Sequence, residues 1–458
     1  MTATGRDDTG GGFFSDERRK RAARELSQRL APLARLPFSL ELWDGSRVPL
    51  GEGTDSRLAI RIASAGVLGA LLRRPTPETL VREYATGGVD LVGGPILEFL
   101  AALEQRSGPR SKLRDVGLAA ALGSALPLLF ARKPAARLAH AFRGDATGRR
   151  QASRRNQDFI QFHYDASNAF YALFLGDEMQ YSCGYFTEWD NGLEQAQLDK
   201  LEMICRKLRL EPGERLLDVG CGWGGLVCHA AQKYGVQAHG VTLSQAQFEY
   251  ARDKAKRLGL ADRVRIDLVD YSELDGSYDK IASIGMFEHV GLANFPRYFG
   301  TLARLLRDRG ILLNHGIASR AKPTPRRQRR ISPEKRLLLK YIFPGSELTS
   351  IGHSLQAMEH AGFEIHDVEG WREHYARTAR AWCERLSKRR DEGIELVGEE
   401  RYRLWLAYLA GVTRGFSNGS MLVFQALGTR HRGHGPSDLP PTRRSLYGDP
   451  AMSSVATD

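Results

Sequence analysis

A glycine-rich turn between an apolar strand and a helix constrains this fold more than any other feature of the sequence. Leu216–Gly225 reads LLDVGCGWGG, and Gly220, Gly222 and Gly224 separate the predicted strand from the predicted helix. Glycine permits a tight turn there and lets the backbone approach a ligand closely above the helix N-terminus. The turn therefore predicts a nucleotide-type ligand site at the end of a strand.

Strands and helices alternate from about Asp199 onward. After the glycine turn come the apolar segments VQAHGVTL, VRIDLVD, YDKIASIG and GILLNHGIAS, with helical patterns between most of them. This order is typical of an α/β fold with a mainly parallel, doubly wound sheet and helices on both faces. FEIHDVEG and MLVFQALG are predicted to form an antiparallel edge pair, separated in sequence by two long helices.

The length and the composition along the chain predict more than one domain. A chain of 458 residues exceeds one ordinary hydrophobic core. Residues 35–110 carry alternating strand and helix patterns and are predicted to form a small α+β domain, before the main domain at 157–429. Residues 111–156 join an apolar helical segment to a basic linker. The ends, 1–34 and 430–458, are predicted to be flexible or disordered.

The longest apolar run is VGLAAALGSALPLLFA, Val116–Ala131, and it contains Pro127. It is shorter than the ~20 residues that a membrane-spanning helix needs. A buried helix or helix pair is the favoured interpretation. An interfacial membrane segment is the alternative, because basic residues flank the run.

Charge and cysteine usage narrow the possible partners and compartments. The net charge of +12 favours an anionic partner without choosing between nucleic acid, a membrane surface and a metabolite. Five cysteines without a CxxC pair argue against a disulfide framework or a metal site and fit a reducing cytoplasm. The N-terminus MTATGRDDTGGGFF has no pattern of a secretory signal.

The chemistry of the glycine turn favours one ligand class. Asp218 lies within the turn, and no lysine follows in the GK[ST] pattern of phosphate-binding loops. A zwitterionic ligand with a sulfonium group suits this turn better than a pyrophosphate, although a dinucleotide reductase remains the alternative. Thr242 and Gln247 follow the second strand and are predicted to contact the ribose. Asp270 follows the third strand and is predicted to meet an adenine amino group.

Further segments extend the pattern well beyond the glycine turn. They are HYDASNAFYALFLGDEMQYSCGYF (His163–Phe186), GVTLSQAQ, ASIGMFEHVG (Ala282–Gly291), LLNHGIAS (Leu312–Ser319), KYIFPGSEL (Lys340–Leu348) and HYARTARAW (His374–Trp382). Together with the glycine turn, they resemble the cyclopropane fatty acid synthase and mycolic acid cyclopropane synthase family. The match runs from about Asn156 to Phe424, and its first block is far more specific than the glycine turn.

The resemblance implies S-adenosylmethionine as co-substrate and a bound bicarbonate. The family's bicarbonate site, which supplies the catalytic residues, falls on Cys183, Glu288, His315, Ile317 and Tyr375. Tyr181 and Ser182 correspond to contacts with the methionine part of the cofactor, and Ile284 to a contact near its adenosyl group. Nucleophilic catalysis by Cys183 is disfavoured, because alkylation of an alkene requires no thiolate.

The expected reaction is cyclopropanation of an unsaturated phospholipid acyl chain. An isolated alkene is a poor nucleophile and needs a strong methyl donor such as a sulfonium. Attack leaves a carbocation, and loss of a proton from the new methyl group closes the ring. The site must hold a base and exclude water. Two alternatives are a methylene-branched product and a non-catalytic lipid-binding protein on the same fold.

A basic segment, Arg320–Lys340, follows the strand that carries His315. It contains nine Lys or Arg residues and one Glu. Docking onto an anionic membrane is its functional interpretation, and a solvated loop is the alternative. We expect a cytoplasmic protein at the inner face of the cell membrane and no nucleic-acid partner, because no nucleic-acid-reading motif accompanies the charge. A homodimer is consistent with the resemblance.

Overall fold

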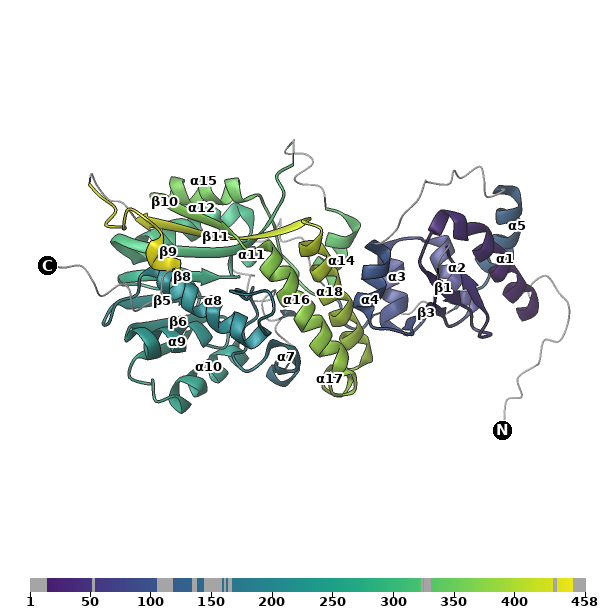
Figure 1. Cartoon of the computed structure of the whole chain (residues 1–458), viewed down its shortest axis with the longest axis horizontal. Coiled ribbons are helices and arrows are strands. Elements are labelled where there is room, and N and C mark those ends of the chain that lie inside the picture. Colours follow the sequence, from purple (N-terminus) through teal and green to yellow (C-terminus); the bar gives the residue numbers. More distant parts are fainter. Residues whose placement is uncertain are drawn as a thin grey trace. The chain divides into compact units, whose positions relative to one another are not determined.

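The chain folds into two compact units, each with its own sheet (Figure 1). The computed structural model describes residues 15–51, 54–104, 118–133, 138–143, 159, 162–163, 167–322, 324, 331–430 and 435–447. The small unit comprises Met1–Ala141, Ser332–Leu337 and Arg390–Ala410, and the large unit comprises Phe142–Ile331, Leu338–Arg389 and Gly411–Asp458. The small unit thus includes two later segments that the prediction of consecutive domains assigned to the main domain.

The large unit is built on a seven-stranded sheet with the order β10-β11-β9-β8-β5-β6-β7. Its strands are β5 (Arg215–Val219), β6 (Gln237–Thr242), β7 (Val264–Leu268), β8 (Tyr278–Ile284), β9 (Leu306–Ser319), β10 (Phe363–Gly370) and β11 (Met421–Arg430). Neighbouring strands from β9 to β7 are parallel, and β11 runs antiparallel to both β9 and β10. The predicted doubly wound α/β fold is confirmed.

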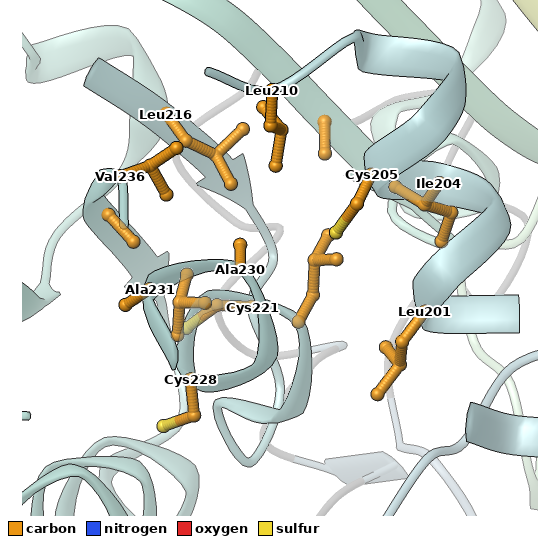
Figure 2. Close-up of a cluster of buried hydrophobic side chains, with 14 of the residues drawn as sticks. Leu201, Ile204, Cys205, Leu210, Leu216, Cys221, Cys228, Ala230, Ala231 and Val236 are labelled. Carbon is orange, nitrogen blue, oxygen red and sulfur yellow. The ribbon is translucent and has the colours of Figure 1, made fainter. Parts of the chain in front are cut away.

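Both faces of this sheet are covered by helices. Leu216 and Leu313 belong to one core cluster, whereas their neighbours Leu217 and Leu312 belong to the other. The first cluster includes residues of α8 (Leu193–Leu208), α9 (Gly225–Tyr234) and α10 (Gln245–Arg257), and the second includes residues of α12 (Phe295–Leu305) and α15 (Ile351–His360). Figure 2 shows part of the first cluster. Burial on two faces explains why these strands read as nearly continuous apolar runs.

The remaining helices are mostly short. They are α7 (Asn168–Leu175), η3 (Tyr271–Glu273), α11 (Phe287–Val290), η4 (Leu292–Asn294), α14 (Pro333–Tyr341), α16 (Arg372–Lys388), α17 (Arg390–Val397), α18 (Glu399–Ser417) and α19 (Arg444–Tyr447). Three helices, not the predicted two, separate β10 from β11. Gly398, at a φ of 79°, ends α17 before α18 begins, because glycine adopts the left-handed region without strain.

The small unit contains a four-stranded sheet with the order β2-β1-β3-β4. Its strands are β1 (Phe38–Glu41), β2 (Arg47–Pro49), β3 (Asp55–Ile62) and β4 (Val89–Val92), and its first helices are α1 (Asp16–Ala34), α2 (Ala65–Arg73), α3 (Pro77–Ala85), α4 (Ile96–Glu104) and α5 (Leu118–Leu129). The pair β1–β3 is parallel, and the other two pairs are antiparallel. This mixture of strands and helices is the expected α+β architecture.

Both chain ends contain structure that the sequence analysis did not predict. Residues 16–34 form α1, because Ala22, Ala23 and Leu26 share a face that packs into a cluster with Leu128. In the tail predicted to be disordered, residues 435–447 are described, and Leu446 is buried. Apolar anchors therefore order segments whose overall composition is polar.

Helix α5 is only half-buried, so the prediction of a buried helix was half correct. Ser124, Pro127 and Leu128 are buried, while Leu122, Leu126 and Phe130 are exposed by 64%, 44% and 55%. Within the described residues, no helix is both long and apolar enough to cross a membrane. The basic segment is partly helical, since its C-terminal residues form α14.

Candidate active site

A pocket opens at the carboxyl ends of the parallel strands β5, β6 and β8. Its empty volume is about 930 Å³ with the open mouth included, a size typical of cofactor sites. The lining residues are Met179–Ser182, Lys200, Leu201, Ile204, Asp218–Trp223, Leu226, Val241–Leu243, Gln247, Val269, Tyr271, Ile284–Met286 and His289. The pocket thus lies where ligands bind in doubly wound folds.

The three glycines of the turn have two different roles. Gly220 and Gly222 line the pocket at φ values of 81° and 55°. Gly224 is the N-cap of α9 and is not among the described lining residues. A Cβ atom on Gly224 would lie 2.9 Å from Cβ of Ala251 in α10. Gly224 therefore permits the close packing of α9 against α10, which the spacing of the glycines alone did not reveal.

Most of the predicted cofactor residues line this pocket. Tyr181, Ser182, Asp218 and Ile284 do so directly. Thr242 and Gln247 also line it, and Thr242 Oγ1 donates a 2.8 Å hydrogen bond to Gln247 Oε1. These residues come from four separate segments of the chain, so the sheet brings them together.

The predicted contact of Asp270 with an adenine amino group stays a prediction. Asp270 is not among the described lining residues, although Val269 and Tyr271 on either side of it are. Its Oδ1 accepts a 2.8 Å hydrogen bond from the backbone N–H of Ser272 and caps the short helix η3. A carboxylate at a helix N-cap satisfies backbone donors, and one oxygen of Asp270 has this local role.

Two buried ionisable groups share the pocket wall. Burial raises the pKa of Asp218 to about 7 and lowers the pKa of Lys200 to about 7. The sequence analysis selected Asp218 and missed Lys200. The sequence does contain a pattern that could have indicated Lys200, since it lies four residues from both Ala196 and Ile204 on the apolar face of α8. A charged residue within a helical apolar stripe is rare and indicates a special role.

A second group, the polar cluster, consists of the buried side chains of Glu288, His315 and Gln425 and the backbone N–H of Ile317. Glu288 Oε1 accepts a hydrogen bond of 2.5 Å from the backbone N–H of Ile317. His315 lies two residues before Ile317 on β9 and pairs in register with Gln425 of β11 and Ile284 of β8. The side chains of Gln425 and His315 are joined at 3.1 Å between Nε2 and Nδ1.

Protonation in the polar cluster is set by burial and by Gln425. Burial raises the pKa of Glu288 to about 7 and lowers the pKa of His315 to about 3. Because an amide nitrogen can only donate, His315 Nδ1 accepts from Gln425 and the ring proton lies on Nε2. Glu288 Oε2, His315 Nε2 and Gln425 Oε1 have no hydrogen-bond partner among the described residues. Such orphaned atoms can form hydrogen bonds with a bound polar ligand or with water.

Cys183 and Tyr375, the other two predicted bicarbonate residues, connect to this cluster through Trp371. Cys183 Sγ lies 3.7 Å from the Trp371 carbonyl oxygen, and the Trp371 ring is edge-on to His315 at 5.4 Å. Burial raises the pKa of Cys183 well above its usual value, so a thiolate is strongly disfavoured. Tyr375 follows one helical turn later, and its ring stacks on Phe416 at 4.3 Å.

His289 is a pocket residue to which the sequence analysis gave no catalytic role. It lines the pocket and stacks on Phe343 at 4.6 Å. Burial lowers its pKa to about 4, so it is neutral near pH 7. Phe170 and Phe174, which belong to the same family-specific block as Cys183, are fully buried core residues.

Comparison with known proteins agrees with this geometry. Residues 151–426 match the family model described as mycolic acid cyclopropane synthetase. A Pseudomonas putida protein named "Probable fatty acid methyltransferase" is 37% identical over 417 residues, covering 90% of this chain and 96% of that protein. The Escherichia coli K12 cyclopropane-fatty-acyl-phospholipid synthase is 37% identical over 268 residues, covering 58% of this chain and 66% of that protein.

Solved structures give the same result. The crystal structure of mycolic acid cyclopropane synthase CmaA1 complexed with SAH and CTAB aligns with a TM-score of 0.57 and 32% identity, covering 60% of this chain and 98% of that chain. The match to the first relative extends well beyond the residues covered by the family model. The resemblance noted in the sequence is confirmed. The chain therefore belongs to the mycolic acid cyclopropane synthetase family of S-adenosylmethionine-dependent methyltransferases.

Proposed function

We propose that this protein converts the cis double bond of an unsaturated phospholipid acyl chain into a cyclopropane ring. The observation that carries the proposal is the polar cluster, which has three orphaned polar atoms and adjoins the segment Ile284–Met286 of the cofactor pocket. Ring closure requires removal of a proton close to the methyl donor, so a buried proton-accepting site is needed there. The name of the Escherichia coli relative supports a phospholipid substrate.

The donor set of the polar cluster fits the bicarbonate that the family resemblance implies. His315 Nε2–H can donate to an anion, and Glu288 Oε2 and Gln425 Oε1 can accept from its hydroxyl group. Glu288, His315 and the backbone of Ile317 would hold it, with Cys183 and Tyr375 nearby. Bicarbonate bound there supplies a small base for the proton lost in ring closure.

The residues of the chain have defined tasks in this reaction. Tyr181 and Ser182 would orient the methionine end of S-adenosylmethionine, which supplies an electrophilic methyl group. Glu288 Oε2 would take over the proton from the bound bicarbonate, and burial raises the pKa of Glu288 to about 7. Glu288 and His315 are exposed by only 3% and 2%, and a buried site of this kind excludes the water that would trap a carbocation.

A methylene-branched acyl chain is the second candidate product. The Pseudomonas putida relative and a Mycobacterium tuberculosis relative, tuberculostearic acid methyltransferase, are both named as methyltransferases, not as cyclopropane synthases. The same pocket and methyl donor would serve. A hydride shift from the methyl-bearing carbon to the neighbouring cationic carbon would come first, and loss of a proton from the methyl group would then leave an exocyclic methylene. A non-catalytic lipid-binding role is less consistent with two intact sites for polar ligands.

Product analysis tests the proposal. Purified protein is incubated with S-adenosylmethionine, bicarbonate and liposomes of a defined monounsaturated phospholipid, and the lipids are examined by mass spectrometry and NMR. A gain of one CH₂ with cyclopropyl proton signals and no olefinic signals is expected. The same gain with an exocyclic methylene signal would favour the branched product. No gain, despite measured cofactor binding, would overturn the substrate assignment.

We also propose peripheral contact with an anionic membrane. Leu122, Leu126 and Phe130 follow one another at four-residue spacing, are exposed, and precede the basic Arg132 and Lys133. An apolar helix face beside basic residues is typical of interfacial binding. The Leu122→Asp/Leu126→Asp variant should float less with anionic liposomes than the wild type, while turnover of detergent-dispersed lipid stays unchanged. Undiminished flotation would contradict this contact.

A further inference from the structure

The cofactor pocket contains a buried lysine whose hydrogen bonds go to neutral groups. Lys200 projects from α8, is 0% exposed and lines the pocket. Its Nζ donates a 3.0 Å hydrogen bond to Ser182 Oγ and another hydrogen bond to Gln180 Oε1. An ammonium group has three donors, so one donor remains for a ligand.

A second lysine on the same helix provides the contrast. Lys207 is 1% exposed, and its Nζ is paired with Glu369 and lies 3.9 Å from Asp367. None of the described carboxylates lies within 4.0 Å of Lys200 Nζ. A buried ammonium is costly unless an anion accompanies it. The protein supplies that anion to Lys207 and does not supply it to Lys200.

Asp218 provides a buried charge of the opposite sign in the same pocket. It lies at the end of β5, is 3% exposed, and its Oδ1 has no hydrogen-bond partner among the described residues. The two groups interact electrostatically, beyond the distance of an ion pair. One buried cation and one buried anion that both line the pocket are complementary to a zwitterion.

We propose that Lys200 binds the α-carboxylate of S-adenosylmethionine, opposite Asp218, which binds its α-ammonium group. The proposal deepens the cofactor assignment of the family and is independent of the lipid product. Ser182 and Gln180 hold Nζ in position, since both accept hydrogen bonds from it. The lowered pKa of Lys200 supports this role, because a bound carboxylate would restore the charged form that burial disfavours.

The test compares two ligands with two variants. Dissociation constants for S-adenosylhomocysteine and for its decarboxylated analogue are measured by calorimetry without lipid. Lys200→Met should weaken S-adenosylhomocysteine binding about 10- to 100-fold, as expected for a lost charged hydrogen bond. The decarboxylated analogue should bind the variant and the wild type within about threefold, because it has no carboxylate to lose.

Lys207→Met is the matched control, since it removes an equally buried lysine from the same helix outside the described pocket lining. It should leave the ratio of the two affinities unchanged. Lys200→Gln keeps a hydrogen-bond donor for Ser182. If the methionine variant does not fold, the affinities of the two ligands are compared in this glutamine variant instead. Equal weakening of both ligands, or unchanged binding of S-adenosylhomocysteine, would overturn the proposal. Either result would leave the cyclopropanation proposal standing, because that proposal is tested by lipid products.

Discussion

The cofactor pocket and the polar cluster both contain buried ionisable side chains, but they are assembled differently. The pocket is centred on one continuous strand, turn and helix, β5 to α9, where Asp218 and the first two glycines lie together in sequence. The polar cluster joins Glu288, His315 and Gln425 from α11, β9 and β11. The first arrangement can be recognised in a short motif, whereas the second requires strand register.

The two regions also differ in how their charges are balanced. In the pocket, Lys200 and Asp218 carry opposite charges and lie too far apart for an ion pair. In the polar cluster, Glu288 is buried with a backbone N–H and the neutral His315. A zwitterion therefore suits the pocket, and a small hydrogen-bonding anion suits the polar cluster. Four experiments test these roles.

Glu288→Gln should have the largest effect, and it should be confined to turnover. Removing the buried proton-accepting group should lower kcat by about 10²- to 10⁴-fold, with S-adenosylhomocysteine affinity within about threefold of wild type. Single-turnover kinetics and calorimetry measure the two quantities. Glu347→Gln is a control, because Glu347 also accepts a backbone hydrogen bond, from Leu292. Full turnover in Glu288→Gln would remove Glu288 from the mechanism.

Asp218→Asn should weaken cofactor binding, in contrast to Glu288→Gln, which should lower turnover. Loss of the buried carboxylate should weaken S-adenosylhomocysteine about 10- to 100-fold. The affinity for 5′-methylthioadenosine, which lacks the ammonium group, should stay the same. Titration calorimetry with both ligands measures the difference. A loss that is equal for both ligands would show that Asp218 acts on the shape of the turn and not on the ammonium group.

The pH dependence of turnover should follow the protonation of Glu288 in the polar cluster. Burial raises the pKa of Glu288 to about 7, so this group is mostly neutral below pH 7 and mostly ionised above it. If the carboxylate takes up the proton, kcat should rise about tenfold between pH 6 and pH 8. The measurement needs saturating substrates and a constant bicarbonate concentration. A kcat that falls above pH 7 would assign Glu288 as a neutral hydrogen-bond donor instead.

The smallest effects are expected for alanine substitutions at Gly222 and Gly224, and the two variants should differ in stability and in cofactor affinity. A Cβ atom on Gly222 meets nothing within 4 Å, whereas one on Gly224 meets Ala251 at 2.9 Å. Gly224→Ala should therefore be less stable than Gly222→Ala by about 1–3 kcal/mol in urea unfolding. Gly222→Ala should weaken cofactor binding more, because its new methyl group enters the pocket. The reverse order of stabilities would contradict the packing role of Gly224.

The doubly wound fold, the glycine turn and the family motifs can all be recognised in the sequence alone. These features depend on patterns within short segments, namely apolar periodicity, turn glycines and distinctive residue blocks. The same patterns were sufficient to place Asp218, Thr242 and Gln247 at one edge of the sheet, because the carboxyl ends of parallel strands meet there.

Which polar groups are buried without a hydrogen-bond partner, and which already have one, becomes clear only in the folded structure. Asp270 caps η3 with one carboxylate oxygen, and Lys200, which the sequence analysis missed, is buried and lines the pocket. Likewise, α1 forms because Leu128, about a hundred residues later, covers its apolar face. Desolvation and hydrogen-bond satisfaction depend on residues that are distant in sequence, and packing brings those residues together.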